Sequence, residues 1–184
     1  MPTIISHAAV PLALGLGLGS GMIPGRLLLA GVAAAMLPDL DVLAFKVGIA
    51  YADDMGHRGI THSLLFSMLL GLLACHFAPM LNSHRKKAAV FVFAAGISHG
   101  ILDMFTNGGL GIAFFWPLSH ERYFLPCRFI EVSPLTPDKV LSTRGLVVLY
   151  SELKWVWLPS ISLGLVLAAV RLRGKGVRAE ANRP

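Results

Sequence analysis

Charged residues are scarce in this sequence. Lysine, arginine, aspartate and glutamate together make up 14% of its 184 residues, whereas hydrophobic residues make up 55% and the mean hydropathy is +0.68. Soluble domains are typically about 25% charged and about 45–50% apolar. The shortage of charge therefore excludes an ordinary soluble domain and indicates an integral membrane protein.

Cysteine is almost absent as well. Cys75 lies inside an apolar run and Cys127 in a polar connection, which excludes a disulfide framework and a zinc site built from thiolates. A basic segment ahead of the first apolar run is also missing, because residues 1–6 contain no lysine or arginine. We therefore expect that run to be a retained helix rather than a cleaved signal peptide.

Basic residues outnumber acidic ones and give a formal net charge of +6, but they form no stripe with interleaved aromatic residues. We therefore expect no nucleic-acid partner. The basic residues concentrate at Arg85-Lys86-Lys87 and again from Arg171 to Arg183, each time at the edge of an apolar run. This placement is typical of the cytoplasmic flanks of membrane helices, so the expected partners are membrane lipids.

The apolar runs predict an all-α fold, a polytopic transmembrane bundle of four to five helices in one domain over residues 1–184. Helices are expected over 4–22, 61–77, 88–105 and 155–171. A shorter run over 27–37 is expected to end at Pro38, because the residue before a proline avoids the α region.

The segments between these helices are predicted to be polar or interfacial. Residues 39–59 are expected to form a polar connection, residues 110–154 a long extracytoplasmic connection, and residues 172–184 a basic cytoplasmic tail. The aromatic stretch at 112–117 is too short to span and is expected at the membrane interface. Thr61 or Ser63 is the expected N-cap of the third helix.

Histidine and aspartate residues gather at one end of this predicted bundle. In an up-and-down bundle the starts of odd helices and the ends of even helices lie on the same side. Seven candidate metal ligands fall on that side: His7, Asp39, Asp41, His57, His62, His99 and Asp103. The two basic clusters fall on the other side, which the positive-inside rule makes cytoplasmic. We therefore expect the seven residues to face the periplasm or cell exterior.

The residue types at this end suit a metal. His99 and Asp103 are spaced i, i+4 on one helix face, and Gly100 between them permits close backbone approach. Asp39 and Asp41 would point the same way in an extended chain. Imidazole with carboxylate suits a divalent ion, zinc above all, with manganese or iron as alternatives.

Catalytic roles follow from the same set. A carboxylate left free of the metal, Asp39 or Asp41, would serve as a general base, and Arg58 is expected in the catalytic set as a group that binds an anion. Arg122 is a second candidate for that role.

Each residue also has a simpler interpretation. His7 could be an interfacial histidine, Asp39 and Asp41 a solvated loop, His62 a helix cap, and His99 with Asp103 a structural ion pair. If these simpler interpretations were correct, the residues would all lie on one side of the bundle only by chance. Their common location therefore favours the metal site. Outside this set, His76 and His84 are expected to be structural, Asp53 and Asp54 solvated, and His120 is left unassigned.

Several motifs together resemble one family. They are His7, Pro38-Asp39-Leu40-Asp41, His57-Arg58-Gly59-Ile60-Thr61-His62-Ser63 and Ser98-His99-Gly100-Ile101-Leu102-Asp103, with further likeness at 106–109, 115–119 and 121–124. Over nearly the whole chain the sequence resembles the YdjM-like (DUF457) family of membrane-bound metal-dependent hydrolases. The resemblance implies an inner-membrane hydrolase with a distant likeness to zinc-dependent phospholipase C.

The predicted function is therefore a membrane-embedded metal-dependent hydrolase that acts on a phosphoester or lipid-linked substrate at the outer membrane surface. Two alternatives use the same ligands without hydrolysis. A metal transporter or sensor is disfavoured because the predicted cytoplasmic half lacks acidic residues. A structural or regulatory protein, in which the metal only joins helix ends, would show a closed ligand shell.

Overall fold

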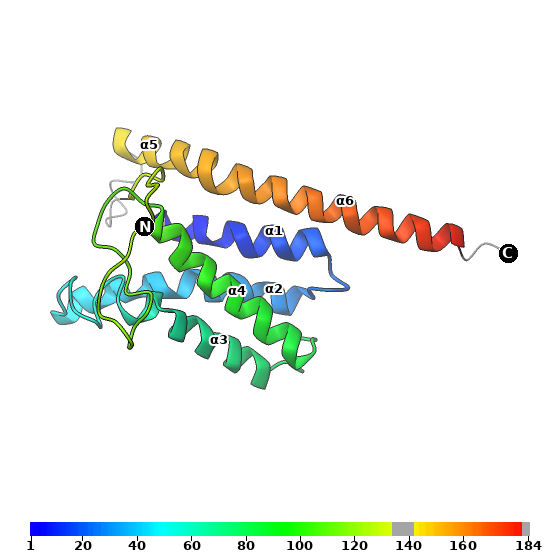
Figure 1. Cartoon of the computed structure of the whole chain (residues 1–184), viewed down its shortest axis with the longest axis horizontal. Helices are drawn as coiled ribbons and strands as arrows, with labels where there is room; N and C mark the ends of the chain where they lie inside the picture. Colours follow the sequence, from blue (N-terminus) through cyan, green and yellow to red (C-terminus); the bar gives the residue numbers. More distant parts are fainter. Residues whose placement is uncertain (134–141, 182–184) are drawn as a thin grey trace.

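The computed structural model describes residues 1–133 and 142–181, with side chains up to residue 175. Helices dominate this part of the chain, and its only strand-like pairings are isolated bridges at Thr106–Ile130 and Ile112–Tyr123. Figure 1 shows the helices running side by side, with most of the connecting chain gathered at one end and the last helix extending beyond the other end. The predicted all-α bundle is confirmed.

The helical segments combine into five rods. They are η1 (Ile4–Ala8) with α1 (Ala9–Leu18), α2 (Gly25–Met36) with η2 (Leu37–Val47), η3 (Ile60–His62) before α3 (Leu64–His76), α4 (Arg85–Met104), and α5 (Thr143–Glu152) with η5 (Leu153–Trp157) and α6 (Leu158–Ala181). Segments η1, η2 and η3 are 3-10 helices, and η5 is a π-helical stretch. Three stretches are long and apolar enough to cross a membrane: Gly25–Val47, Arg85–Met104 and Thr143–Lys175.

The second rod is longer than the sequence predicts. The α geometry of α2 changes to 3-10 geometry at Leu37, and Pro38 occupies the first turn of η2. In a helix that continues from α2, the N–H that proline lacks would bond to a carbonyl of the preceding turn, and the Ala35 carbonyl of that turn instead accepts from His99 Nδ1. The helix therefore continues to Val47, and the expectations that it ends at Pro38 and that 39–47 is a loop are wrong.

The other helix ends shift by smaller amounts. The first helix ends at Leu18 rather than Met22, because Gly19 adopts a positive φ of 81°. Ser63, one of the two expected caps, accepts a hydrogen bond from the Phe66 N–H at the start of α3. The fourth helix begins at Arg85, so the first basic cluster forms its opening turn.

The last rod begins at Thr143 rather than near Trp155, because the Ser142 side chain caps it by accepting from the Gly145 N–H. Residues 143–154 of the predicted connection are therefore helical. The helix runs to Ala181, so most of the predicted tail is helical as well. Residues 134–141 of the connection and 182–184 of the tail lie outside the described residues.

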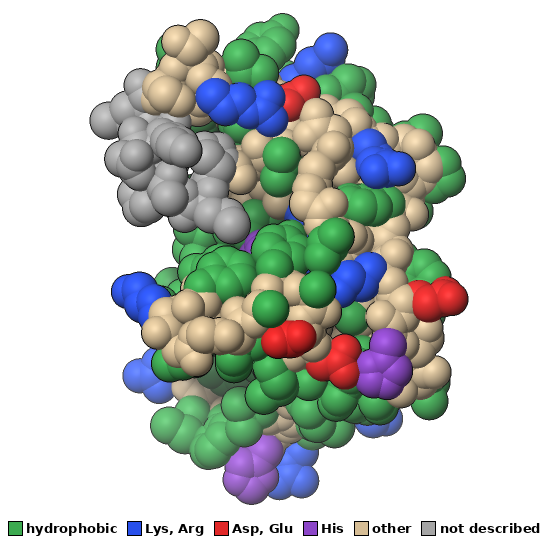
Figure 2. All heavy atoms as spheres, turned by 90° about the vertical axis from the view of Figure 1, so that its left-hand side faces the viewer, with side chains coloured by type: hydrophobic (Ala, Val, Ile, Leu, Met, Phe, Trp, Pro, Cys, Tyr) green, Lys and Arg blue, Asp and Glu red, His purple; other side chains and the backbone are tan. Residues whose placement is uncertain are grey.

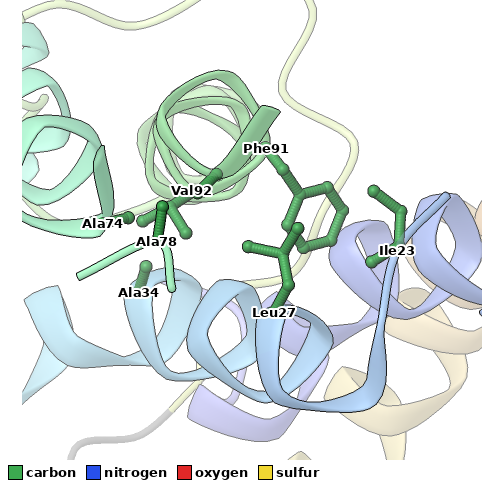
Figure 3. Packing of buried hydrophobic residues seen from close by; sticks show 8 residues of the cluster. Ile23, Leu27, Ala34, Ala74, Ala78, Phe91 and Val92 are labelled. Atoms are coloured by element: carbon green, nitrogen blue, oxygen red, sulfur yellow. The ribbon is translucent and has the colours of Figure 1, made fainter. Parts of the chain in front are cut away.

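The apolar core fixes α2 against α4. Figure 3 shows Phe91 of α4 pointing between Leu27 and Ile23. A Cβ on Gly31 of α2 would lie 2.4 Å from the Phe91 ring, so the missing side chain allows the two helices to approach. This packing sets the spacing between η2 and the end of α4, which both carry candidate ligands.

The connection after α4 folds over the end of the bundle. The Ala113 N–H donates to the Arg58 carbonyl over 2.9 Å, and the Leu64 N–H donates to the Phe114 carbonyl over 2.9 Å. Ile112 and Ala113 of this segment are buried, while Phe115 is exposed. The aromatic stretch predicted for the interface therefore begins as part of a cap over the bundle end.

Candidate metal centre

The structure brings all seven predicted ligands into one buried cluster. They come from η1 (His7), η2 (Asp39 and Asp41), the loop before η3 (His57), η3 (His62) and the last turns of α4 (His99 and Asp103). The cluster lies at the end of the bundle where the connecting chain gathers, the end that faces the viewer in Figure 2. The expectation that helix-end parity places these residues together is confirmed.

Five of these residues form an inner group whose side chains face one another: His7, Asp39, His62, His99 and Asp103. The His7 Nε2 lies 3.5 Å from Asp39 Oδ2 and 3.6 Å from Asp103 Oδ1. The His99 Nε2 lies 3.5 Å from Asp39 Oδ1, and the His62 Nε2 lies 3.3 Å from Asp103 Oδ2. One ligand atom from each of Asp39, His62, His99 and Asp103 can be chosen so that all lie within 4.8 Å of one another.

These facing atoms are buried but lack hydrogen bonds within the described chain. They are Nε2 of His7, His62 and His99 and both carboxylate oxygens of Asp39 and Asp103. Leaving buried polar atoms unsatisfied is costly, and leaving buried charges without compensation costs more. A cation at the centre would satisfy the nitrogen lone pairs and the carboxylates together, so the residues present fit a divalent metal.

Hydrogen bonds behind two of the rings orient their Nε2 atoms inward. The His99 Nδ1 donates to the Ala35 carbonyl over 2.7 Å, which leaves the lone pair on its Nε2. The His62 Nδ1 lies 3.2 Å from Asp41 Oδ2, which selects the same tautomer. Histidine ligands of metals in proteins almost always donate their second ring N–H to a carbonyl or carboxylate in this way.

Asp41 supports the inner group from behind. Its carboxylate accepts from His57 Nδ1 over 2.5 Å, from the Arg58 N–H over 3.1 Å and from the Thr61 hydroxyl over 2.7 Å. Asp41, His57 and His62 form a second set of atoms close enough to share an ion. Because the oxygens of Asp41 already have protein partners, its geometry favours orienting the two histidines over binding metal directly.

The two aspartates face different partners because η2 is a 3-10 helix. With three residues per turn, side chains two positions apart diverge by about 120° around the axis. Asp39 therefore faces the inner group and Asp41 faces His57. The expectation that both point the same way along an extended chain is wrong.

Arg58 is directed into the protein. Its Nε lies 3.3 Å from Asp103 Oδ2, its Nη1 donates to the Gly108 and Leu110 carbonyls over 3.0 Å each, and its Nη2 donates to the Thr106 hydroxyl over 2.8 Å. Its backbone φ of 65° is unusual for a residue other than glycine. These contacts favour a positioning role, in which Arg58 neutralises Asp103 and holds the cap.

Arg122, the second predicted anion-binding residue, also has protein partners. Its Nη1 donates to the His57 carbonyl over 3.0 Å, and its Nη2 donates to the Ala52 carbonyl over 3.1 Å and the Asp53 carbonyl over 3.0 Å. It therefore fixes the loop that carries His57.

The cluster attracts positive charge. Burial lowers the pKa of His62, but the neighbouring carboxylates of Asp103, Asp39 and Asp41 outweigh burial and raise that pKa to about 10. His62 lies outside the three long apolar stretches. The carboxylates around His62 therefore favour a positive charge at this position.

A groove of about 670 Å³ reaches the cluster at Asp39. Most of its lining is apolar and comes from η1, η2 and the α5–η5 segment: Ile4, Ile5, Leu40, Val42, Leu149, Leu153 and Trp157. Its walls belong partly to the stretches Gly25–Val47 and Thr143–Lys175, which are long enough to cross a membrane. The groove therefore offers an apolar approach to the cluster.

Glu152 on the wall of this groove was not predicted. This buried carboxylate accepts from the Thr3 N–H over 2.5 Å, from the Thr3 hydroxyl over 2.7 Å and from the Ser6 hydroxyl over 2.7 Å. It joins the last rod to η1 and so helps to position His7. The signal in the sequence is a lone acidic residue close to a long apolar run, where an ionisable residue usually has a function.

Two of the remaining histidines, His76 and His120, lie apart from the cluster. His120 is 69% exposed and pairs with Asp54 over 2.8 Å between its Nδ1 and Oδ2. His76 packs edge-on against Phe77 at the end of α3. Neither belongs to a group of possible ligands within the described part of the chain.

Comparison with known proteins finds similarity to inner membrane proteins. A family model described as YdjM inner membrane protein matches residues 1–176. The chain is also 47% identical over 164 residues to inner membrane protein YbcI of Escherichia coli strain K12, a match that covers 89% of this chain and 95% of that protein. No solved structure matches the chain significantly.

Proposed function

The chain belongs to the YdjM family of inner membrane proteins, and we propose that it is a membrane-embedded hydrolase that uses a divalent metal to cleave a lipid phosphoester. One observation carries this proposal: a buried set of unpartnered imidazole and carboxylate atoms lies at the end of an apolar groove. The basic clusters at the opposite end support an orientation in which the cluster faces the outer membrane surface.

The metal would be held by His7, His62, His99 and Asp103, which leaves the Asp39 carboxylate free. Imidazole nitrogens with carboxylate oxygens suit zinc best in our proposal, with manganese and iron as alternatives. When bound, such an ion polarises a phosphoryl oxygen and makes water acidic enough to supply a nucleophile at neutral pH. Asp41 and the Ala35 carbonyl hold the His62 and His99 rings in the orientation that this requires.

Asp39 is the proposed general base. It is the member of the inner group that also lines the groove, and both its oxygens lack hydrogen bonds within the described chain. It can therefore accept a proton from an attacking water without breaking an existing hydrogen bond. Asp41 would have to release the His57, Arg58 or Thr61 donors first, so it is the weaker candidate.

The substrate would be an amphiphile. An acyl chain fits the apolar walls formed by Leu40, Leu149 and Leu153, and the phosphoester would then lie near Asp39 at the cluster end. A soluble phosphomonoester would gain nothing from these walls. The geometry thus supports a lipid substrate over a soluble one.

A structural metal site is the second candidate. Every member of the inner group is at most 3% exposed, as expected when a metal only joins helix ends in a closed shell. The groove at Asp39 favours the enzyme, because a metal with a purely structural role needs no approach for a substrate.

Hydrolysis by the purified, metal-loaded full chain tests the proposal. The substrates are a panel of diacyl phospholipids in mixed micelles and p-nitrophenyl phosphate as a soluble comparison. We expect turnover of at least one phospholipid, a higher KM for it in Leu149→Trp, and no change in His120→Ala. A wild-type protein that binds stoichiometric metal but hydrolyses no member of the panel would support the structural role instead.

A further inference from the structure

A second cavity lies at the end of the bundle opposite the cluster. Its volume is about 780 Å³, and it opens to the surface between the end of α1, the turn that follows it, the first half of α4 and the last part of α6. Three cationic residues line it: Lys87, Arg171 and Lys175. We propose that this cavity is a binding site for an anionic phospholipid, with its phosphate held by these three residues. The site is independent of the proposed hydrolase.

Arg171 is positioned toward this cavity by the end of α1. Its Nη1 donates to the Leu16 carbonyl over 3.3 Å, and a Cβ on Gly19 would lie only 1.6 Å from that nitrogen. A glycine is therefore required for the guanidinium to pack here. The Arg171 Nε is buried and has no hydrogen-bond partner in the described chain, so a donor remains for a ligand.

The positive charge of the cavity is not balanced by its own walls. None of the residues that line it is acidic. Within residues 1–133 and 142–175, no carboxylate forms an ion pair with Lys87, Arg171 or Lys175. Arg171 and Lys175 lie at the end of a stretch long enough to cross a membrane, where cationic side chains are at the level of the lipid head groups.

The rest of the lining indicates a lipid rather than a free anion. The cavity walls include Leu14, Leu18, Val90 and Phe91, which give a mostly apolar surface below the cations. Val90 is 66% exposed and would face acyl chains in a bilayer. Basic pockets between transmembrane helices bind anionic head groups in this way. A zwitterionic head group would bring its own ammonium against three cations, so the site should prefer phosphatidylglycerol to phosphatidylcholine.

Lipid titration of the delipidated full chain in detergent tests this proposal. The melting temperature is followed as phosphatidylglycerol or phosphatidylcholine is added, because a ligand that binds the folded state raises it. We expect phosphatidylglycerol to stabilise the wild-type protein and phosphatidylcholine to have little effect. The double variant Arg171→Gln with Lys175→Gln should bind phosphatidylglycerol about 30-fold more weakly, which corresponds to two cations at about 1 kcal/mol each.

The matched control is Arg85→Gln with Lys86→Gln. It removes the same charge from the same end of the bundle, but these side chains are exposed and do not line the cavity. We expect its affinity for phosphatidylglycerol to stay within about twofold of wild type. If the Arg171 variant does not fold, Lys87→Gln replaces it and should bind about fivefold more weakly. Equal weakening in both double variants, or full competition by inorganic phosphate, would overturn a lipid site in this cavity.

Discussion

At the scale of single residues, the cluster depends on what stands behind each ligand. His99 is backed by the Ala35 carbonyl and His62 by Asp41, so both rings present Nε2 to the centre. The sequence is enough to assign all seven residues to one end of the bundle, because the positions of the apolar runs alone determine which helix ends lie on the same side. The sequence does not reveal that both Asp41 oxygens already accept hydrogen bonds. Those bonds form because η2 is a 3-10 helix in contact with the His57 loop.

Substituting the two aspartates separates their roles. Asp39→Asn keeps the shape of the side chain but cannot take up a proton at neutral pH, so turnover should fall by about 10²–10⁴. Asp41→Asn should instead weaken metal binding by about 10–100-fold, because it loosens the His62 and His57 rings. Metal content and hydrolysis rate are measured on the same preparations. If Asp39→Asn hydrolyses lipid at the wild-type rate, Asp39 is not the base.

Arg58→Met tests the positioning role of that arginine. The change leaves the buried Asp103 carboxylate without its partner and breaks the bonds to Thr106 and Leu110, so we expect a loss of about 3–5 kcal/mol in stability. Thermal unfolding in detergent measures it, with Arg128→Met as the control, since Arg128 is exposed and stacks over the Phe124 ring. An unchanged melting temperature combined with a raised KM would restore the anion-binding role for Arg58.

At the scale of helices, the sequence predicts where apolar runs lie but not where tertiary contacts extend them. Pro38 is a stop signal in isolation, yet the change to 3-10 geometry at Leu37 carries the helix on to Val47. The start of the last rod at Thr143 depends on the Ser142 cap and on Glu152 docking against η1. The Glu152 contact joins residues 146 positions apart, so their proximity cannot be read from local periodicity.

Close contact between α1 and α6 gives a prediction at this scale. A Cβ on Gly17 would lie 2.8 Å from the backbone oxygen of Gly164, so Gly17→Ala must push the helices apart. We expect it to cost about 1–3 kcal/mol of stability, measured by thermal unfolding. Gly25→Ala is the control, because a Cβ there meets nothing within 4 Å. Equal stability of the two variants would show that this crossing is not tightly packed.

At the scale of the whole molecule, the two ends of the bundle differ in charge and in chemistry. One end carries the histidine and aspartate cluster under its cap, and the other carries the basic turn of α4 and the basic part of α6. The sequence predicts this division because charges at helix ends can be read directly. The two cavities could not be predicted, because each is made by side chains from three or more separate segments.

Membrane orientation is the prediction that belongs to this scale. The basic end should face the cytoplasm, with the N-terminal segment and the cluster outside. Reporter fusions after Ser83 and after Pro184 should give cytoplasmic signals, and an insertion after the exposed Leu118 should give a periplasmic signal. A periplasmic signal at either of the first two positions would reverse the orientation.

Metal content per chain decides whether the cluster is a metal centre. The wild-type protein, purified in detergent and loaded with zinc, manganese or iron in turn, should retain about one ion per chain for at least one metal. His120→Ala should retain the same amount, because His120 lies at the surface and pairs with Asp54. The double variant His62→Ala with His99→Ala should lose the ion while keeping its helical content. A wild-type protein that retains none of the three metals, or a folded double variant with full metal content, would contradict a metal centre at these residues.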